Sequence, residues 1–437
     1  MFNLNAKIKV YDTVKLVPTP KFYEFTYVKK VEISSSYESL TDTASFEMPK
    51  KVFTNASGFK QSGTANLVGK QGSEKSIRDF FKLESFVEIH LGYDGEYKPA
   101  FRGYVTAVKG DSPVTIECED MMYALKKVKA VDDGDAQHSD DNLNAIATNP
   151  TLNEEKFNPK QFFEKRVKQL GLPIKINALD EDMGNLLINR NHSIAQVFEM
   201  LKNKGIYTYF KIEKAVPVLT ITNNPQHHSA AELGSFINRN FIQSPIAGAL
   251  VKKLINKGLD LLSSQLDNAM NNFGGDLFPG KARFRFHYNI INDNLTVLQE
   301  ATRNTRIRVE KYFPNSNTPI HVEMGDPNGQ LFKTYVLHDN ETELPKNVTA
   351  YKKKALETAS ELYQYAALRA MENKPNGLEG YFETFGEPFV RPTDKVVLEN
   401  NKDDDKNGTF QVKKVERSYG DGGYRQKIYL GRRVEVM

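Results

Sequence analysis

The stretch FVEIHLGYDGEYKPAFRGYVTAVKGDSPVTIECED, residues 86–120, decides the fold class. Apolar side chains alternate with charged or polar ones over residues 86–91, 100–108 and 114–118, and Gly, Asp and Pro separate these runs. A period of two is typical of a strand with one buried face. Short alternating strands divided by turns predict a barrel or a sandwich of antiparallel strands.

The same pattern extends toward the N-terminus. Residues 27–34 and 43–48 alternate in the same way, and residues 120–128 form a short helical pattern that Asp120 can cap. We therefore expect a first β domain over residues 1–131.

A different composition follows this β domain. Residues 132–158 are polar and aperiodic, which indicates a boundary or an exposed loop. Helices are then predicted over 159–170, capped by Asn158 and stopped by Gly171, and over 193–204, capped by Ser193 and stopped by Gly205. With short strands at 174–176, 207–212 and 218–221, residues 150–225 are expected to form a small α/β domain.

Residues 226–280 differ from both flanking regions. Apolar residues recur at helical spacing over 246–270, and we expect a helical insertion or arm. Such a helix can pack on its own domain, dock on another subunit or partner, or lie on a membrane surface. Its polar face is not strongly basic, which argues against the membrane. The candidate partner-interface residues are Ile246, Leu250, Leu254, Leu262 and Leu266.

The chain returns to β structure after residue 281. Strands are expected at 283–288, 307–312, 320–323, 333–337, 378–385, 396–399, 409–415 and 425–430. A long Ala-, Leu-, Lys- and Glu-rich helix over 349–372 interrupts them. Residues 281–437 are therefore predicted to be a second β domain with a helix packed on it. The expected fold class is mainly β with α+β parts.

Composition excludes several classes of protein. The 437 residues carry 59 basic and 55 acidic side chains, a net charge of +4, which is too balanced to indicate nucleic-acid binding by bulk charge. The single cysteine, Cys118, cannot form an internal disulfide. No apolar run approaches a membrane span, and the alternating N-terminus has no apolar core of a signal peptide.

The sequence contains no convincing catalytic or metal-binding motif. Residues 63–70 (GTANLVGK) have the wrong spacing for a phosphate loop, and residues 403–408 (DDDKNG) match only half of a calcium loop, since Lys414 occupies the position of the bidentate glutamate. Cys118 lies between two glutamates, which oppose thiolate formation. His227 and His228 lack a third ligand at a recognisable spacing. We therefore expect no catalytic residues, no metal and no cofactor.

Several stretches resemble tail baseplate hub proteins of contractile phages, the late control D-like family, and the hub part of type VI secretion spike proteins. These stretches are FRGYVT at 101–106 with VTIECED at 114–120, the helix–turn pairs of 162–172 and 193–210, the helix of 349–369 and the closing meander of 386–431. The resemblance covers most of the chain except residues 226–280.

The resemblance implies two tube-like β-barrel domains flanking the small α/β domain. It implies a trimer whose six barrels form a pseudo-sixfold ring that joins the tail tube to the central spike. Expected partners are two further copies, the spike, the tube or its initiator, and tape-measure or other baseplate proteins. The expected location is the virion tail baseplate, or that of a related particle, assembled in the bacterial cytoplasm. No spike domain follows residue 437, so we expect a separate hub.

Two other functions are alternatives to the baseplate hub. A carbohydrate-binding or adhesin protein could use the 20 tyrosines as sugar platforms, although the absence of tryptophan counts against it. A peptidoglycan hydrolase has no supporting motif.

Overall fold

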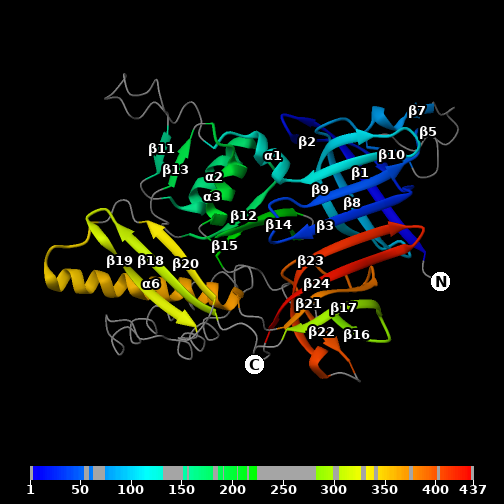
Figure 1. The fold of residues 1–437 in the computed structure, drawn as a ribbon. Coiled ribbons are helices and arrows are strands. Elements are labelled where there is room, and N and C mark those ends of the chain that lie inside the picture. Colours follow the sequence, from blue (N-terminus) through cyan, green and yellow to red (C-terminus); the bar gives the residue numbers. More distant parts are fainter. Residues whose placement is uncertain are drawn as a thin grey trace, which may run out of the picture.

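The computed structural model describes residues 3–53, 59–62, 74–130, 151–154, 157–180, 186–189, 191–203, 205–213, 216–223, 282–298, 305–325, 331–338, 343–373, 377–400 and 404–434. Strands dominate these residues, and helices lie mainly in two places, the middle of the chain and behind one small sheet (Figure 1). The prediction of a mainly β fold with α+β parts is confirmed.

Residues 4–120 build the N-terminal β unit. Its strands are β1 (Leu4–Val14), β2 (Val17–Phe25), β3 (Lys30–Ser36), β4 (Thr43–Met48), β5 (Lys51–Phe53), β6 (Phe59–Gln61), β7 (Glu74–Ser76), β8 (Phe86–Tyr93), β9 (Lys98–Lys109) and β10 (Val114–Asp120). Most apolar positions of the alternating runs point into one core, as Ile33, Phe46 and Ile116 show, whereas Phe86 and Tyr104 belong to the core of the middle unit. Helix α1 (Met122–Lys127) follows, and Asp120 accepts the Met122 N–H through Oδ1 at 3.0 Å.

The middle α/β unit follows the predicted capping signals closely. Helix α2 (Pro159–Leu170) starts where the Asn158 side chain accepts the Gln161 N–H and ends at Gly171 in the left-handed conformation, φ 63°. Helix α3 (Ile194–Asn203) starts where Ser193 and Gln196 cap each other reciprocally. The strands are β11 (Thr151–Glu154), β12 (Lys175–Ala178), β13 (Leu186–Asn189), β14 (Tyr207–Glu213) and β15 (Val216–Thr222).

The long helix packs on a three-stranded sheet within residues 281–437. Helix α6 (Val348–Asn373) covers one face of a separate three-stranded sheet of β18 (Thr305–Phe313), β19 (Ser316–Gly325) and β20 (Leu331–His338). Their shared core includes Val309, Val322 and Tyr363. This helix-backed sheet has a core of its own, so α6 does not pack on the closing meander (Figure 1).

The closing meander belongs to the C-terminal β unit. Its strands are β16 (Ala282–Arg285), β17 (Ile290–Leu298), β21 (Gly377–Phe385), β22 (Lys395–Glu399), β23 (Gly408–Gly420) and β24 (Gly423–Val434). A single sheet runs through both β units in the order β17-β21-β24-β23-β3-β4-β10-β9-β8-β1-β2-β6, with β22 and β16 branching from β23. Among the described strands this path is open at both ends, and the tube-like barrels stay a prediction.

Candidate assembly interface

The two β units meet by direct strand pairing. Strand β3 pairs antiparallel with β23 over six residue pairs, from Lys414 opposite Ser36 to Tyr419 opposite Val31. The backbone groups at the edge of β3 are therefore satisfied by a segment almost 400 residues away in the chain. This junction makes the two units one continuous sheet (Figure 1).

One face of the joined sheet carries polar side chains without a break at the junction. Consecutive cross-strand partners form one row from β10 to β21, which consists of Glu119, Thr43, Ser34, Glu416, Lys427 and Glu383. The neighbouring row consists of Glu117, Ser45, Glu32, Ser418 and Arg425. Residues of both rows line a shallow hollow of about 550 Å³. We call this surface the polar face.

Lysines balance the carboxylates of the polar face. Lys126 pairs with Glu119 at 2.6 Å and Lys109 with Glu117 at 2.7 Å. Lys414 pairs with Glu416 at 2.6 Å. Burial alone would raise the pKa of Glu416, but hydrogen bonds from Lys414 and Tyr429 lower that pKa below its ordinary value. The polar face therefore carries many charged groups but little net charge.

The opposite side of the junction is a shared core. Tyr424 of β24 is fully buried in the core of the N-terminal β unit. The hydroxyl of Tyr93, on β8, donates to the Tyr424 carbonyl at 2.9 Å and accepts the Gly386 N–H at 3.1 Å. Lys98 adds an ion pair to Glu387 at 2.7 Å. Tyr424 thus completes the core of the N-terminal unit, while Tyr93 and Lys98 add polar contacts to the C-terminal unit.

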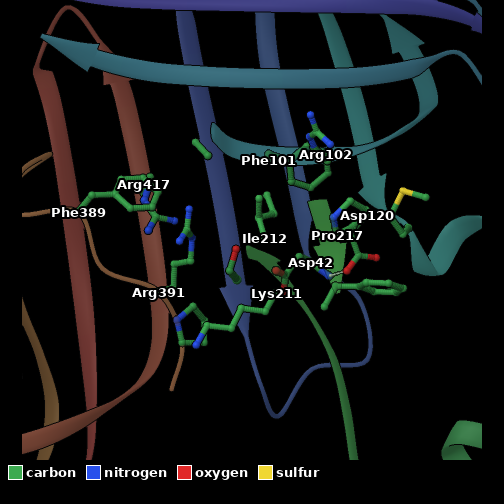
Figure 2. A pocket seen from close by; sticks show the side chains of 15 residues that line it. Asp42, Phe101, Arg102, Asp120, Lys211, Ile212, Pro217, Phe389, Arg391 and Arg417 are labelled. Atoms are coloured by element: carbon green, nitrogen blue, oxygen red, sulfur yellow. Dashed lines mark hydrogen bonds between the residues drawn. The ribbon is translucent and has the colours of Figure 1, made fainter. Parts of the chain in front are cut away.

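A small polar cavity of about 40 Å³ lies where both β units meet the middle unit. In Figure 2 the guanidinium groups of Arg391 and Arg417 lie on one side, and Asp42 and Asp120 lie on the other. Arg417 is buried, stacks on the Phe389 ring at 4.1 Å from its centroid and donates to the Val390 carbonyl.

A backbone hydrogen bond links the two acidic residues of this cavity. Asp42 accepts the Ser36 N–H at 3.0 Å and donates its own N–H to the Asp120 carboxylate at 3.2 Å. Desolvation raises the pKa of Asp42 to about 7, although Ser36, Ser35 and Arg417 oppose the rise. Desolvation and the nearby Asp42 raise the pKa of Asp120. Desolvation also lowers the pKa of Arg417, so ionisation is disfavoured throughout this joint.

The middle unit reaches the same joint through β14. Lys211 lies 3.4 Å from the Thr393 hydroxyl and 3.6 Å from the Asp394 carboxylate. On the other side of the middle unit, Lys202 donates to the Glu38 carbonyl at 3.0 Å. The middle unit also shares an apolar core with the N-terminal unit through Phe86 and Tyr104, and these charged groups add contacts at its margins.

The predicted partner-interface residues Ile246, Leu250, Leu254, Leu262 and Leu266 lie outside the described residues, and so do His227, His228 and residues 63–70. Cys118 is buried in the core, where desolvation and then Glu117 raise its thiol pKa. Residues Asp404–Lys406 form one 3₁₀ turn, and Lys406 pairs with Asp293 at 2.9 Å. The described part of the chain contains no group of three His, Cys, Asp or Glu side chains that could hold a metal ion.

Sequence reasoning missed the residues of the junction. Arg417 does carry a signal, because it occupies an inward position between Val415 and Tyr419 in an alternating strand. A charged residue in the apolar phase of a strand indicates a buried polar contact. None of the helices in the described ranges is long and apolar enough to cross a membrane.

No protein-family model matches the sequence, and no curated protein matches it. Among solved structures, the 43 kDa tail protein of prophage MuSo2 from Shewanella oneidensis is similar, with a TM-score of 0.50, 10% identity and 98% of each chain covered. A tail protein from Neisseria meningitidis is similar with a TM-score of 0.51 and 9% identity over 98% of this chain and 96% of that chain. A chain of a PdpA–VgrG complex has a TM-score of 0.48 at 8% identity and covers all of this chain and 66% of that one. The fold of this chain is therefore the fold of phage tail proteins.

Proposed function

We propose that the protein is the structural hub of a phage-tail-like baseplate. Three copies form a pseudo-sixfold ring that joins the tail tube to the central spike. The observation that carries this proposal is the continuous sheet, in which β3 and β23 join two β units of one chain edge to edge. Residues 1–131 and 281–437 would supply the tube-like parts, and residues 150–225 the small domain between them.

The joined sheet supports this role on physical grounds. A ring built from edge-paired sheets leaves no strand edge exposed, which removes the aggregation hazard of an open edge. Each chain supplies two β units, so three chains supply six and a threefold spike can match a sixfold tube. We propose no catalytic step for the protein.

We propose that the polar face lines the channel of this ring. Its carboxylates are paired with lysines such as Lys109, Lys126 and Lys414, so the wall presents little net charge. A polar wall without a basic stripe does not retain nucleic acid, because non-specific binding depends on unpaired cationic groups. A passing polymer would therefore not be held in the channel.

Residues 226–280 would provide the contact to a tape-measure or other baseplate protein through Ile246, Leu250, Leu254, Leu262 and Leu266. The variants Leu254→Pro and Leu262→Pro test this role. We expect them to weaken assembly more than monomer folding, because proline interrupts a helix. Equal loss of assembly and of folding would contradict the arm.

The hub is tested by the native mass of the purified full chain. Light scattering after gel filtration should give three chains of 49.6 kDa each, and negative-stain images should show a ring with a pore. A stable dimer, or a monomer that does not assemble at any concentration, would overturn the proposed ring.

A further inference from the structure

The two β units repeat each other over five strands, and only the sixth, β1 or β16, differs in direction. The N-terminal unit has the order β3-β4-β10-β9-β8-β1, and the C-terminal unit has the order β17-β21-β24-β23-β22-β16. Every neighbouring pair in both orders is antiparallel except β16 with β22, which is parallel. Strand β17 therefore corresponds to β3, and β23 corresponds to β9.

Buried residues fix the correspondence at the level of single positions. Phe46 pairs with Ile116, which pairs with Val108, in the N-terminal unit. Phe382 pairs with Ile428, which pairs with Val415, in the C-terminal unit. The two rows have nearly the same side chains in the same order. In this alignment the buried Ile33 of β3 corresponds to the buried Leu295 of β17.

An irregular feature repeats as well. Val105 of β9 exchanges backbone hydrogen bonds with Ser85 and Glu84, and Glu84 has φ 68°. Val412 of β23 does the same with Asp394 and Thr393, and Thr393 has φ 74°. In both strands the pairing then shifts by one residue, at Thr106 and at Lys413. Two non-glycine residues with positive φ at equivalent places confirm the alignment, because such residues are uncommon.

The two β units differ in what covers the strand edge beyond this shift. In β23 the segment Lys414–Tyr419 pairs with β3. In β9 the equivalent segment, from Ala107 to Lys109, pairs with β10 alone among the described strands. Its outward carbonyls, at Val108 and Gly110, accept hydrogen bonds from the Arg78 side chain instead of from a strand. A side chain that is still 44% exposed thus occupies a strand edge.

The matching edge lies at the other end of the path. Strand β17 corresponds to β3 but pairs only with β21 within the described residues, and its Ile291 is 46% exposed. Six strands separate β17 from β9 in the sheet. Among the described strands the two edges do not pair with each other: β17 pairs with β21, and the end of β9 pairs with β10.

We propose that β17 of one copy pairs antiparallel with the end of β9 in the next copy. Thr296 then lies opposite Lys109, as Ser34 lies opposite Glu416 inside the chain, and Val297 lies opposite Val108. This inference rests on the proposed function and specifies its subunit contact. The occupant is a second copy of this chain, because each chain carries both halves of a junction that it already forms once internally. Such a head-to-tail contact closes into a ring when the rotation per copy divides a full turn.

The contact is tested by a disulfide cross-link in the full chain. The variant carries Lys109→Cys and Thr296→Cys, both at exposed positions. Directly opposed residues of antiparallel strands bring their Cβ atoms within about 4.5–5.5 Å, close enough for a disulfide after a small adjustment. The native Cys118 is buried and does not compete. Non-reducing electrophoresis should show covalent species of two and three chains that return to one chain with reductant.

Two matched variants serve as the positive and the negative control. Ser34→Cys with Glu416→Cys joins the equivalent positions inside one chain, so it should cross-link without any increase in mass. Lys109→Cys with Asn292→Cys moves one partner four residues along β17, roughly 13 Å, and should give no intermolecular species.

The outcomes separate this contact from the proposed function. A native trimer without the cross-link between residues 109 and 296 would overturn the β17–β9 contact and leave the hub in place. Equal cross-linking of the residue 109–292 variant would also overturn it, since the register would not be specific. A monomer without any cross-link would overturn both.

Discussion

The closed β3–β23 junction and the open edges at β17 and β9 use the same strand geometry with different backing. Behind the closed junction lie Tyr424 in the neighbouring core and Arg417 in the three-unit joint. At the open edges Leu295 and Val108 reach only the core of their own unit, and beside them lie an exposed Ile291 and the Arg78 side chain. Backbone pairing would be the same in the internal junction and in the proposed contact between chains. The buried side chains therefore make the difference in the stability of the two contacts.

This difference has a consequence for assembly. Burial of apolar area and removal of cavities stabilise a contact far more than the net gain of each backbone hydrogen bond, which is about 1 kcal/mol. The internal junction should therefore form with the core of the chain and be lost only when the chain unfolds. The proposed contact between copies should be weaker and dependent on concentration.

The largest effect is expected from Tyr424→Ala. The ring of Tyr424 is fully buried in the core of the other β unit, so its removal leaves a cavity at the junction. We expect a loss of about 3–5 kcal/mol in the free energy of unfolding, measured by urea denaturation. Tyr429→Ala, on the polar face, is the matched control and should cost about 1 kcal/mol. A small loss for Tyr424→Ala would show that the two units do not share a core.

Arg417→Met should have the next largest effect. The change removes the stacking on Phe389, the hydrogen bond to Val390 and the positive charge that faces Asp42. We expect a loss of about 2–3 kcal/mol in urea denaturation, because the Val390 carbonyl loses its buried donor and the Phe389 ring loses its cation–π partner. Arg417→Lys keeps the charge but not the planar stacking on Phe389. Its free energy of unfolding should lie between those of the parent and of Arg417→Met. A Met variant as stable as the parent would mean that the charge at this joint is dispensable.

Asp42→Asn sharpens the comparison through pH. The folded pKa of Asp42, about 7, lies above its ordinary value near 3.8, so burial favours the protonated form. The resulting stability is complete below about pH 4 and is lost as pH rises through 7. From pH 5 to pH 8 the ionisation of Asp42 should cost the parent about 2.6 kcal/mol that it does not cost the Asn variant, measured by urea denaturation at both values. Glu117→Gln, on the polar face, should behave as the parent does.

Local signals in the sequence predicted the helices of the middle unit with accuracy. Asn158, Gly171 and the Ser193–Gln196 pair act within one turn of the residues they cap, so their effect is visible in a short window. The alternating strands from β8 to β10 were predicted for the same reason. Strand β2 was missed because Pro18 and Pro20 interrupt its pattern. Prolines are tolerated there because the described pairing with β6 covers only residues 23–25 of β2. Strand β17 was missed because Asn and Asp fill its centre.

The candidate interface had no local signal of this kind. The β3–β23 pairing joins segments almost 400 residues apart, and nothing within either strand specifies its partner. The internal repeat was hidden as well, because Phe46 and Phe382 match in position while most residues around them differ. Only the pairing registers bring these positions together. The separation of α6 from the meander has the same cause, since its partner strands β18 and β19 looked like any other strands.

Arg78→Ala should have the smallest effect and tests the open edge directly. The Arg78 guanidinium holds the Val108 and Gly110 carbonyls in a place that an incoming strand would occupy. Its removal frees these acceptors for the β17 strand of the next copy, while the exposed side chain contributes little to folding. We expect the concentration at which half the chains are assembled, measured by light scattering, to fall about fivefold, or about 1 kcal/mol. Arg78→Lys keeps a donor at this edge and should change assembly less. A rise in that concentration for Arg78→Ala would mean that Arg78 itself contacts the neighbouring copy, and the edge of β9 would then be covered by a side chain in the ring as well.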